Sequence, residues 1–292
     1  MQLTLHVPIL TEERGRSEMH EKTLFQRLKS PKGITGLAIL CSFIFIAIAA
    51  PLITPYSPAD VSSSPLLKPS SEHLLGTDDV GKDIFSNLVY GSRTSLMVAL
   101  MVSFGVLVIG TLAGVFSGYT GGNFDRVMMR GVDIFLMIPD LPLILILAAY
   151  LSPSLWNIIF ILIVMGWPVG ARITRAQTKT LRVSGHVDFA RVSGAGNWYV
   201  IKKHIVPDLY PIMITTVVMQ SIRAILSESG LAFLGLGDPS FPSWGTMIKY
   251  AVSYPLVFFT DAWMWWLMPA GLCITLLVLS FVLVGQALEG EK

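Results

Sequence analysis

Long apolar stretches constrain the fold of this chain more than any other feature of its sequence. A transmembrane helix needs about 20 predominantly apolar residues, and six stretches of the 292-residue chain reach or approach that length. They cover residues 34–53, 95–119, 131–151, 155–171, 209–231 and 263–288. Only 14% of the residues are charged, whereas a soluble domain has about a quarter. The sequence therefore predicts an all-α membrane protein with six transmembrane helices.

The distribution of lysine and arginine predicts how these helices are oriented. Sixteen of the 21 basic residues lie in the tail before residue 34, the loop after the second stretch, the segment 172–208 and the C-terminus. Positive charge is enriched on the cytosolic side of membrane proteins, so we expect both termini to be cytosolic. The predicted order is a cytosolic tail (1–33), a first transmembrane helix (34–54), an extracytoplasmic loop (55–92), a region with five further helices (93–288) and a cytosolic end (289–292).

Glycines in two of the predicted helices occur at spacings that favour close packing. Gly105, Gly110 and Gly114 lie in the second stretch, and Gly166 and Gly170 lie in the fourth. Because glycine has no Cβ atom, such positions let two helix backbones approach closely inside a membrane. We expect these glycines to serve packing within the helix bundle.

The sequence offers no catalytic or metal-binding set of residues. Cys41 and Cys273 both lie in apolar stretches, without metal-ligand spacing. The segment from Gly76 to Asp83 resembles a phosphate-binding loop, but Asp83 stands where the Mg²⁺-binding hydroxyl belongs. A turn that caps a helix leading into the second stretch is the better interpretation. We therefore expect this chain to have no ATP site, no bound cofactor and no nucleic-acid partner.

A polar, basic segment at residues 188–207 separates the fourth and fifth apolar stretches. Glycine tolerates backbone angles that other residues avoid, so Gly194 and Gly196 are expected to break this segment into two short helices. Asn197 is expected to cap the second helix and Pro207 to end it.

The second of these short helices is expected to be amphipathic. Trp198, Ile201 and Ile205 recur at helical spacing and should share one face. A helix of this kind can dock against a protein partner, or it can lie on anionic lipid at the membrane surface. The helix by itself favours neither interpretation.

Ionisable residues inside the apolar stretches are further candidates for a functional role. Arg223 and Glu228 fall in the fifth stretch, and Asp140 lies beside Pro139 in the third. A charged group there costs roughly 2.5–3.5 kcal/mol on insertion scales, so it faces protein or water. Arg223 and Glu228 are candidates to line a translocation path. The alternative is that each satisfies a neighbouring helix or subunit.

Three stretches together resemble a known family. They are HLLGTDDVGKDIFS at residues 73–86, ESGLAFLGLG followed by PSWG at residues 228–245, and the segment with Asp188-Phe189-Ala190, Gly194 and Val206-Pro207. The last is similar to the Glu-Ala-Ala loop of the permease subunits of binding-protein-dependent ABC importers, with its later glycine and its Leu-Pro end. The first two resemble the peptide and nickel branch of that family, and the dipeptide and oligopeptide type of second permease most of all.

This resemblance implies a type I ABC importer transmembrane domain in a prokaryotic inner or plasma membrane. Besides the lipid bilayer, it implies four protein partners: a homologous permease in the same membrane, two cytosolic ABC ATPases that use ATP and Mg²⁺, and an external substrate-binding protein. The cytosolic coupling loop would cover residues 176–207. The residues implied in ATPase coupling are Asp188, Ala190, Gly194, Trp198, Ile201, Ile205 and Pro207.

Two departures from the family pattern bear on the choice of ATPase. Asp188 replaces glutamate and keeps the charge with a shorter reach, while Phe189 is bulky where alanine is usual.

The implied substrate is a di- or oligopeptide, with nickel chelates and oligosaccharides as alternatives in the same class. An alternative outside the class of ABC importers is a secondary transporter that works alone, but the helix at 197–205 would then have no role. A membrane enzyme would need a nucleophile–base set that the sequence lacks.

Overall fold

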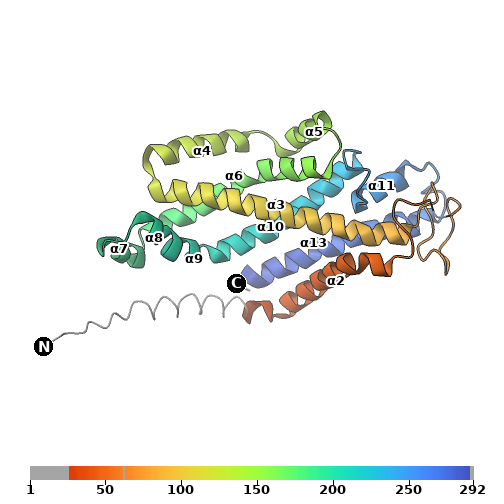
Figure 1. Ribbon diagram of the computed structural model, residues 1–292, viewed down its shortest axis with the longest axis horizontal. Coiled ribbons are helices and arrows are strands. Elements are labelled where there is room, and N and C mark those ends of the chain that lie inside the picture. The colour runs from red at the N-terminus through yellow and green to blue at the C-terminus, as the bar shows by residue number, and fades with distance from the viewer. Residues whose placement is uncertain (1–25, 62, 290–292) are drawn as a thin grey trace.

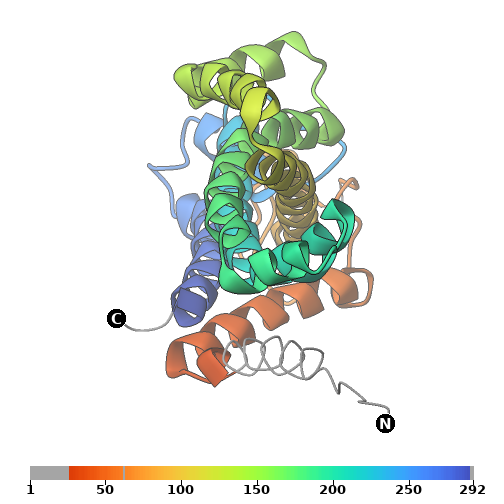
Figure 2. The same ribbon diagram turned by 90° about the vertical axis from the view of Figure 1, so that its left-hand side faces the viewer.

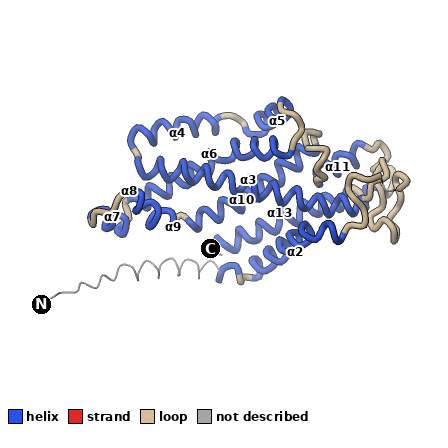
Figure 3. Tube along the Cα trace, viewed as in Figure 1, coloured by secondary structure: helices blue, strands red, loops and turns tan. Residues whose placement is uncertain are grey.

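The computed structural model describes residues 26–61 and 63–289, and the predicted tail up to residue 25 and the last three residues lie outside this part. All regular elements in the described ranges are helices (Figures 1 and 3). Five of them are long and apolar enough to cross a membrane. They are α2 (Pro31–Ile53), α3 (Ile84–Thr120), α6 (Leu155–Arg182), α10 (Tyr210–Phe233) and α13 (Leu267–Glu289), the last counted together with the short α12 (Ala262–Trp265).

The third crossing is a bent pair of helices. It consists of α4 (Gly122–Met137) and α5 (Asp140–Tyr150), which meet at 84°. Since Gly110 lies next to Ala171 and Gly118 lies next to Thr178, α3 and α6 run in the same direction. The pair α4–α5 must therefore carry the chain back across the bundle, and with it the structure has the six crossings that the sequence predicts.

The prediction of one continuous third helix at residues 131–151 was wrong. The helix begins earlier, at Gly122, and it breaks at Ile138 and Pro139, which both have extended backbone angles. Proline has no N–H to donate, and it disfavours the helical conformation of the residue before it. The break therefore falls where proline stands.

Helix α3 begins at Ile84, so residues 84–92 of the predicted extracytoplasmic loop are helical. The Asp83 side chain caps this helix by accepting a hydrogen bond of 2.7 Å from the Ser86 backbone N–H. The first turns pack against α11 (Trp244–Ser253), where the Trp244 indole N–H donates to the Leu88 carbonyl at 2.9 Å. Burial against protein lets polar residues extend the helix beyond its apolar stretch.

The predicted glycine contacts join α3 to α6. A Cβ atom on Gly110 would lie 3.1 Å from the backbone nitrogen of Ala171, and one on Gly114 would lie 2.6 Å from the Cβ of Thr174. From the facing helix, a Cβ on Gly166 would lie 2.7 Å from the Val106 side chain. The prediction that these glycines serve packing is confirmed.

Helix α2 lies on the opposite side of the bundle from α4 and α5 (Figures 1 and 2). It packs against α13, and the Arg27 guanidinium before α2 donates to the Leu288 carbonyl near the end of α13 at 2.9 Å. The start of the first crossing and the end of the last one therefore lie at the same end of the bundle, as an even number of crossings requires.

We predict that Gly114→Ala destabilises the protein and Gly131→Ala does not. The new Cβ at residue 114 meets the Thr174 side chain, whereas a Cβ on Gly131 meets no atom within 4 Å. Overpacking costs typically about 1–3 kcal/mol, while alanine inside an open helix face gains up to about 1 kcal/mol over glycine. Thermal unfolding of the detergent-purified protein checks this. Equal midpoints for the two variants would contradict it.

Candidate functional site

The predicted break in the segment 188–207 is present at one end of the bundle. Helix α7 (Gly185–Val192) is followed by Gly194 with φ +87°, and α8 (Asn197–Val200) starts after Gly196 (Figure 1). The Ala195 N–H donates to the Ala190 carbonyl at 3.0 Å and closes the turn. A positive φ strains any residue with a Cβ atom, so the turn requires glycine at position 194.

Helix α8 continues through a π-helical turn. This turn, η1 (Ile201–Ile205), leads into the short α9 (Val206–Asp208) and then almost directly into α10. The Leu209 N–H donates to the Ile205 carbonyl at 3.1 Å, across Pro207. The prediction that Pro207 ends the helix was therefore wrong. Proline is tolerated in the first turn of a helix, where its missing N–H is not needed, and α9 starts one residue before it.

The three apolar residues of this helix are buried to different degrees. Ile201 and Ile205 are buried, at 7% and 0% exposure, but Trp198 is 66% exposed. The buried residues of this helix are Val200, Ile201, His204 and Ile205. The three apolar residues predicted to share one face therefore differ in exposure, and the docking role of Trp198 stays a prediction.

Contacts with α3 fix the orientation of this helix. The Tyr119 hydroxyl at the end of α3 donates to the Asn197 side-chain oxygen at 3.0 Å, and the Arg182 guanidinium lies 5.9 Å from the centre of the Tyr119 ring. Asn197 was predicted to cap α8, but Gly196 holds the cap position and Asn197 is the first helical residue. Its side chain bonds to the neighbouring helix instead of to its own backbone.

The family-implied residues at the start of the segment have different environments. Ala190 is buried against Val187 and Val200, whereas the Asp188 side chain is 59% exposed and forms a weak pair with Arg191 at 3.7 Å. Pro207 is exposed. The structure therefore divides the predicted coupling residues into a buried set that holds the segment and an exposed set that faces outward.

A cluster around Asp125 ties α3, α4 and α6 together beside this segment. The Asp125 carboxylate accepts hydrogen bonds from the Ser117 hydroxyl at 2.5 Å, from the Lys179 ammonium at 2.7 Å and from two nitrogens of the Arg175 guanidinium. This cluster was not predicted from the sequence. Its only local signal is that Arg175 and Lys179 are four residues apart, on one face of α6.

A histidine–aspartate pair joins α7 to α9, with one residue just before and the other just after the segment 188–207. His186 Nε2 on α7 lies 3.1 Å from the Asp208 carboxylate on α9, and the His186 and His204 rings are 6.0 Å apart. In the described ranges, no group of three or more His, Cys, Asp or Glu residues could hold a metal ion. The pair can link α7 to α9 by a charge-assisted hydrogen bond when the imidazole is protonated.

The candidate path residues lie in two different environments. Arg223 on α10 forms an ion pair with Asp140 at the start of α5, and both side chains are partly exposed. Glu228 is 2% exposed, with the Ser229 hydroxyl 3.4 Å from one carboxylate oxygen and the Ser243 side chain also in contact with the carboxylate. The two path residues contact different partners, and their role in a path stays a prediction.

We predict that Tyr119→Phe loosens α8 and η1 without unfolding the bundle. The variant removes one hydrogen bond, worth about 1 kcal/mol, so amide hydrogen exchange in residues 197–208 should become about fivefold faster. Tyr150→Phe is the matched control, because Tyr150 is 89% exposed and lies on α5. Unchanged exchange in Tyr119→Phe would show that the bond does not hold the segment.

Comparison with known proteins gives two matching family models. The model described as binding-protein-dependent transport system inner membrane component matches residues 110–290, and the N-terminal TM domain of oligopeptide transport permease C matches residues 24–69. Among solved structures, a chain of the MetNI methionine ABC transporter has a TM-score of 0.49 and 19% identity, covering 65% of this chain and 96% of that one.

Similar relatives cover most of the chain. The dipeptide transport system permease protein DppC of Alkalihalophilus pseudofirmus is 37% identical over 91% of this chain and 86% of its own length. The probable D,D-dipeptide transport system permease protein DdpC of Escherichia coli is 33% identical over 96% of both chains. The chain therefore belongs to the family of binding-protein-dependent transport system inner membrane components, and it is a multi-pass protein of the inner membrane.

Proposed function

We propose that this chain is one of two permease subunits of an ATP-driven importer of di- and oligopeptides, and that it forms half of the translocation path. The relatives named as dipeptide permeases, which align along most of the chain, support peptide as the substrate class. The observation that carries the proposal in the structure is the exposed apolar surface on α7 and α8.

That surface suits a protein partner. Phe189 and Val192 on α7 are 56% and 89% exposed, and Trp198 and Tyr199 on α8 are 66% and 48% exposed. Large apolar side chains gathered at one exposed end typically mark an interaction site, and aromatic residues supply much of the binding energy at such sites. A cytosolic ABC ATPase is the partner that the family assigns to this segment, so both chain ends would be cytosolic.

The buried side of the same segment supports transmission of force into the bundle. Val200, Ile201 and Ile205 pack against Val115 and Tyr119 of α3. The cluster around Asp125 holds the same end of α3 to α4 and α6. A displacement imposed on the exposed surface would therefore move these three helices together, as rigid-body alternation between two states requires.

The remaining parts of the importer would be separate subunits. A homologous permease would form the other half of the path, an external binding protein would deliver the peptide, and two ATPase subunits would bind and hydrolyse ATP with Mg²⁺. This chain supplies no ATP site in the proposal. Arg223, tied to Asp140, and Glu228 are its candidate path residues.

We predict that Gly194→Val abolishes ATP-driven uptake while Gly196→Val retains it. Both glycines would accommodate a Cβ atom without contact, but Gly194 has φ +87° and Gly196 has φ −65°. A β-branched residue is strained at positive φ and relaxed in the extended region. Uptake and membrane insertion measured together check this prediction. Normal uptake in Gly194→Val would contradict it.

We also predict that Trp198→Ala weakens binding of the ATPase subunits. Truncating a central aromatic residue at an interface costs at least about 2 kcal/mol, or about thirtyfold in affinity. Trp156→Ala is the control, since Trp156 is 55% exposed but lies near the start of α6, far from α7 and α8. Titration of purified ATPase onto the permease pair in nanodiscs measures both. Equal affinities would remove Trp198 from the docking surface.

A further inference from the structure

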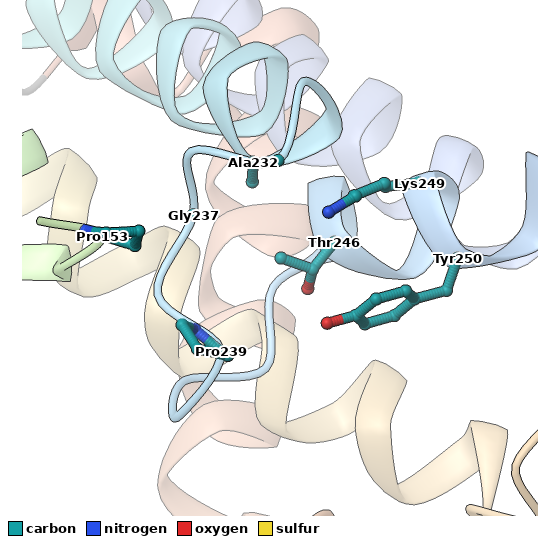
Figure 4. A pocket seen from close by; sticks show the side chains of 8 residues that line it. Pro153, Ala232, Gly237, Pro239, Thr246, Lys249 and Tyr250 are labelled. Carbon is teal, nitrogen blue, oxygen red and sulfur yellow. The ribbon is translucent and has the colours of Figure 1, made fainter. Parts of the chain in front are cut away.

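A small cavity lies at the opposite end of the bundle from α7 and α8. Its volume is about 180 Å³, and it lies between α11, the loop that follows α10, and Pro153 from the loop before α6 (Figure 4). Its polar side chains are those of Thr246, Lys249 and Tyr250 on α11, and Ala232, Pro153 and Pro239 form apolar walls. The cavity thus has one cationic group and two hydroxyl groups beside its apolar walls.

The loop backbone leaves room for the lysine. Gly235 has φ +88°, and a Cβ atom at this position would lie 2.9 Å from the Lys249 ammonium nitrogen. Any other residue at position 235 would be strained and would push the ammonium aside. The lysine and the tyrosine hydroxyl both project from α11 toward the loop (Figure 4).

The lysine has no counter-ion in the part of the chain that the structure describes. The loop's own carboxylate, Asp238, accepts hydrogen bonds from the backbone N–H of Leu155 at 3.1 Å and of Ser240 at 2.9 Å. Among the described residues, Lys249 contacts a charged or aromatic group only at the Tyr250 ring, 5.7 Å from its ammonium. Lys249 is partly buried as a residue, and a bound anion would compensate the charge of its ammonium.

We propose that this cavity binds the C-terminal carboxylate of the incoming peptide, an inference that rests on the proposed function. A carboxylate can accept hydrogen bonds from both the Lys249 ammonium and the Tyr250 hydroxyl. The apolar walls suit the last side chain of the peptide. The volume of about 180 Å³ is below the range of about 300–1,000 Å³ for whole ligands, so the site holds one end of the peptide.

The test compares two permeases with two peptides. The complete importer in proteoliposomes is made with the wild-type chain or with Lys249→Met, and it is supplied with a radiolabelled dipeptide or with the same dipeptide as its C-terminal amide. The acid-to-amide uptake ratio is measured for each permease, and the two ratios are compared. The binding protein is identical in all four reactions, so its own preference for acid or amide affects both ratios equally. Loss of a charge-assisted hydrogen bond should lower uptake of the free acid about tenfold relative to the amide. Lys249→Arg should retain wild-type uptake.

The controls separate this inference from the proposed function. Lys68→Met removes a lysine outside the cavity, which is paired with Asp261 at 3.7 Å, and it should leave the ratio unchanged. If Lys249→Met lowers the uptake of acid and amide equally, or lowers neither, the proposed carboxylate site is wrong. The proposed function in peptide import is not contradicted by that result. An equal fall that follows weaker docking of the binding protein assigns the lysine to that protein instead. A wild-type importer that takes up neither peptide overturns the proposed function.

A second measurement does not require import of the amide. The wild-type complex without binding protein is treated with an amine-reactive reagent, and modification of Lys249 is quantified by mass spectrometry. An N-acetylated dipeptide at millimolar concentration should protect Lys249 several-fold, and its C-terminal amide should not. Protection by neither compound, or by both equally, overturns the site.

Discussion

The close contact between α3 and α6 is the constraint on which the rest of this structure depends. Inside a membrane, helices associate through packing and hydrogen bonds rather than through the hydrophobic effect, so backbones must come close. Gly110, Gly114 and Gly118 make this possible over two turns of α3. The contact ends where Tyr119 and Asp125 lie. The close approach of the two backbones therefore positions Tyr119, which holds the exposed segment, and Asp125, which holds the start of α4.

Features that rest on one residue or on a local pattern could be predicted from the sequence. The six apolar stretches predicted the crossings, because the length and composition of a stretch can be read directly from the sequence. Gly194 predicted the break between α7 and α8, because positive φ is a property of the residue itself. The packing role of Gly114 followed from the lack of a Cβ atom. The segment that the family resemblance assigns to ATPase coupling lies at one end of the bundle, and its coupling role stays a prediction.

Features that depend on contacts between distant residues could not be predicted in the same way. Asn197 was expected to cap its own helix, but Tyr119, 78 residues away in sequence, takes its side-chain oxygen. The π-helical turn at Ile201–Ile205 lets the helix continue through Pro207, and no local sequence pattern predicts this turn. The role of Asp125 depends on two cations of α6, Arg175 and Lys179, which lie 50 and 54 residues away in sequence. In each case the partner, not the residue, decides the outcome.

The bend between α4 and α5 is a place where the thickness of the bilayer can affect this protein. Helix α4 has 16 residues, which gives a length of about 24 Å at 1.5 Å per residue, less than the roughly 30 Å of a hydrocarbon core. The crossing is therefore completed by α5, which is bent by 84° from α4. Asp140 starts α5 at this bend, and its partly exposed ion pair with Arg223 joins the bend to α10. A change in bilayer thickness that alters the bend would therefore also act on this ion pair.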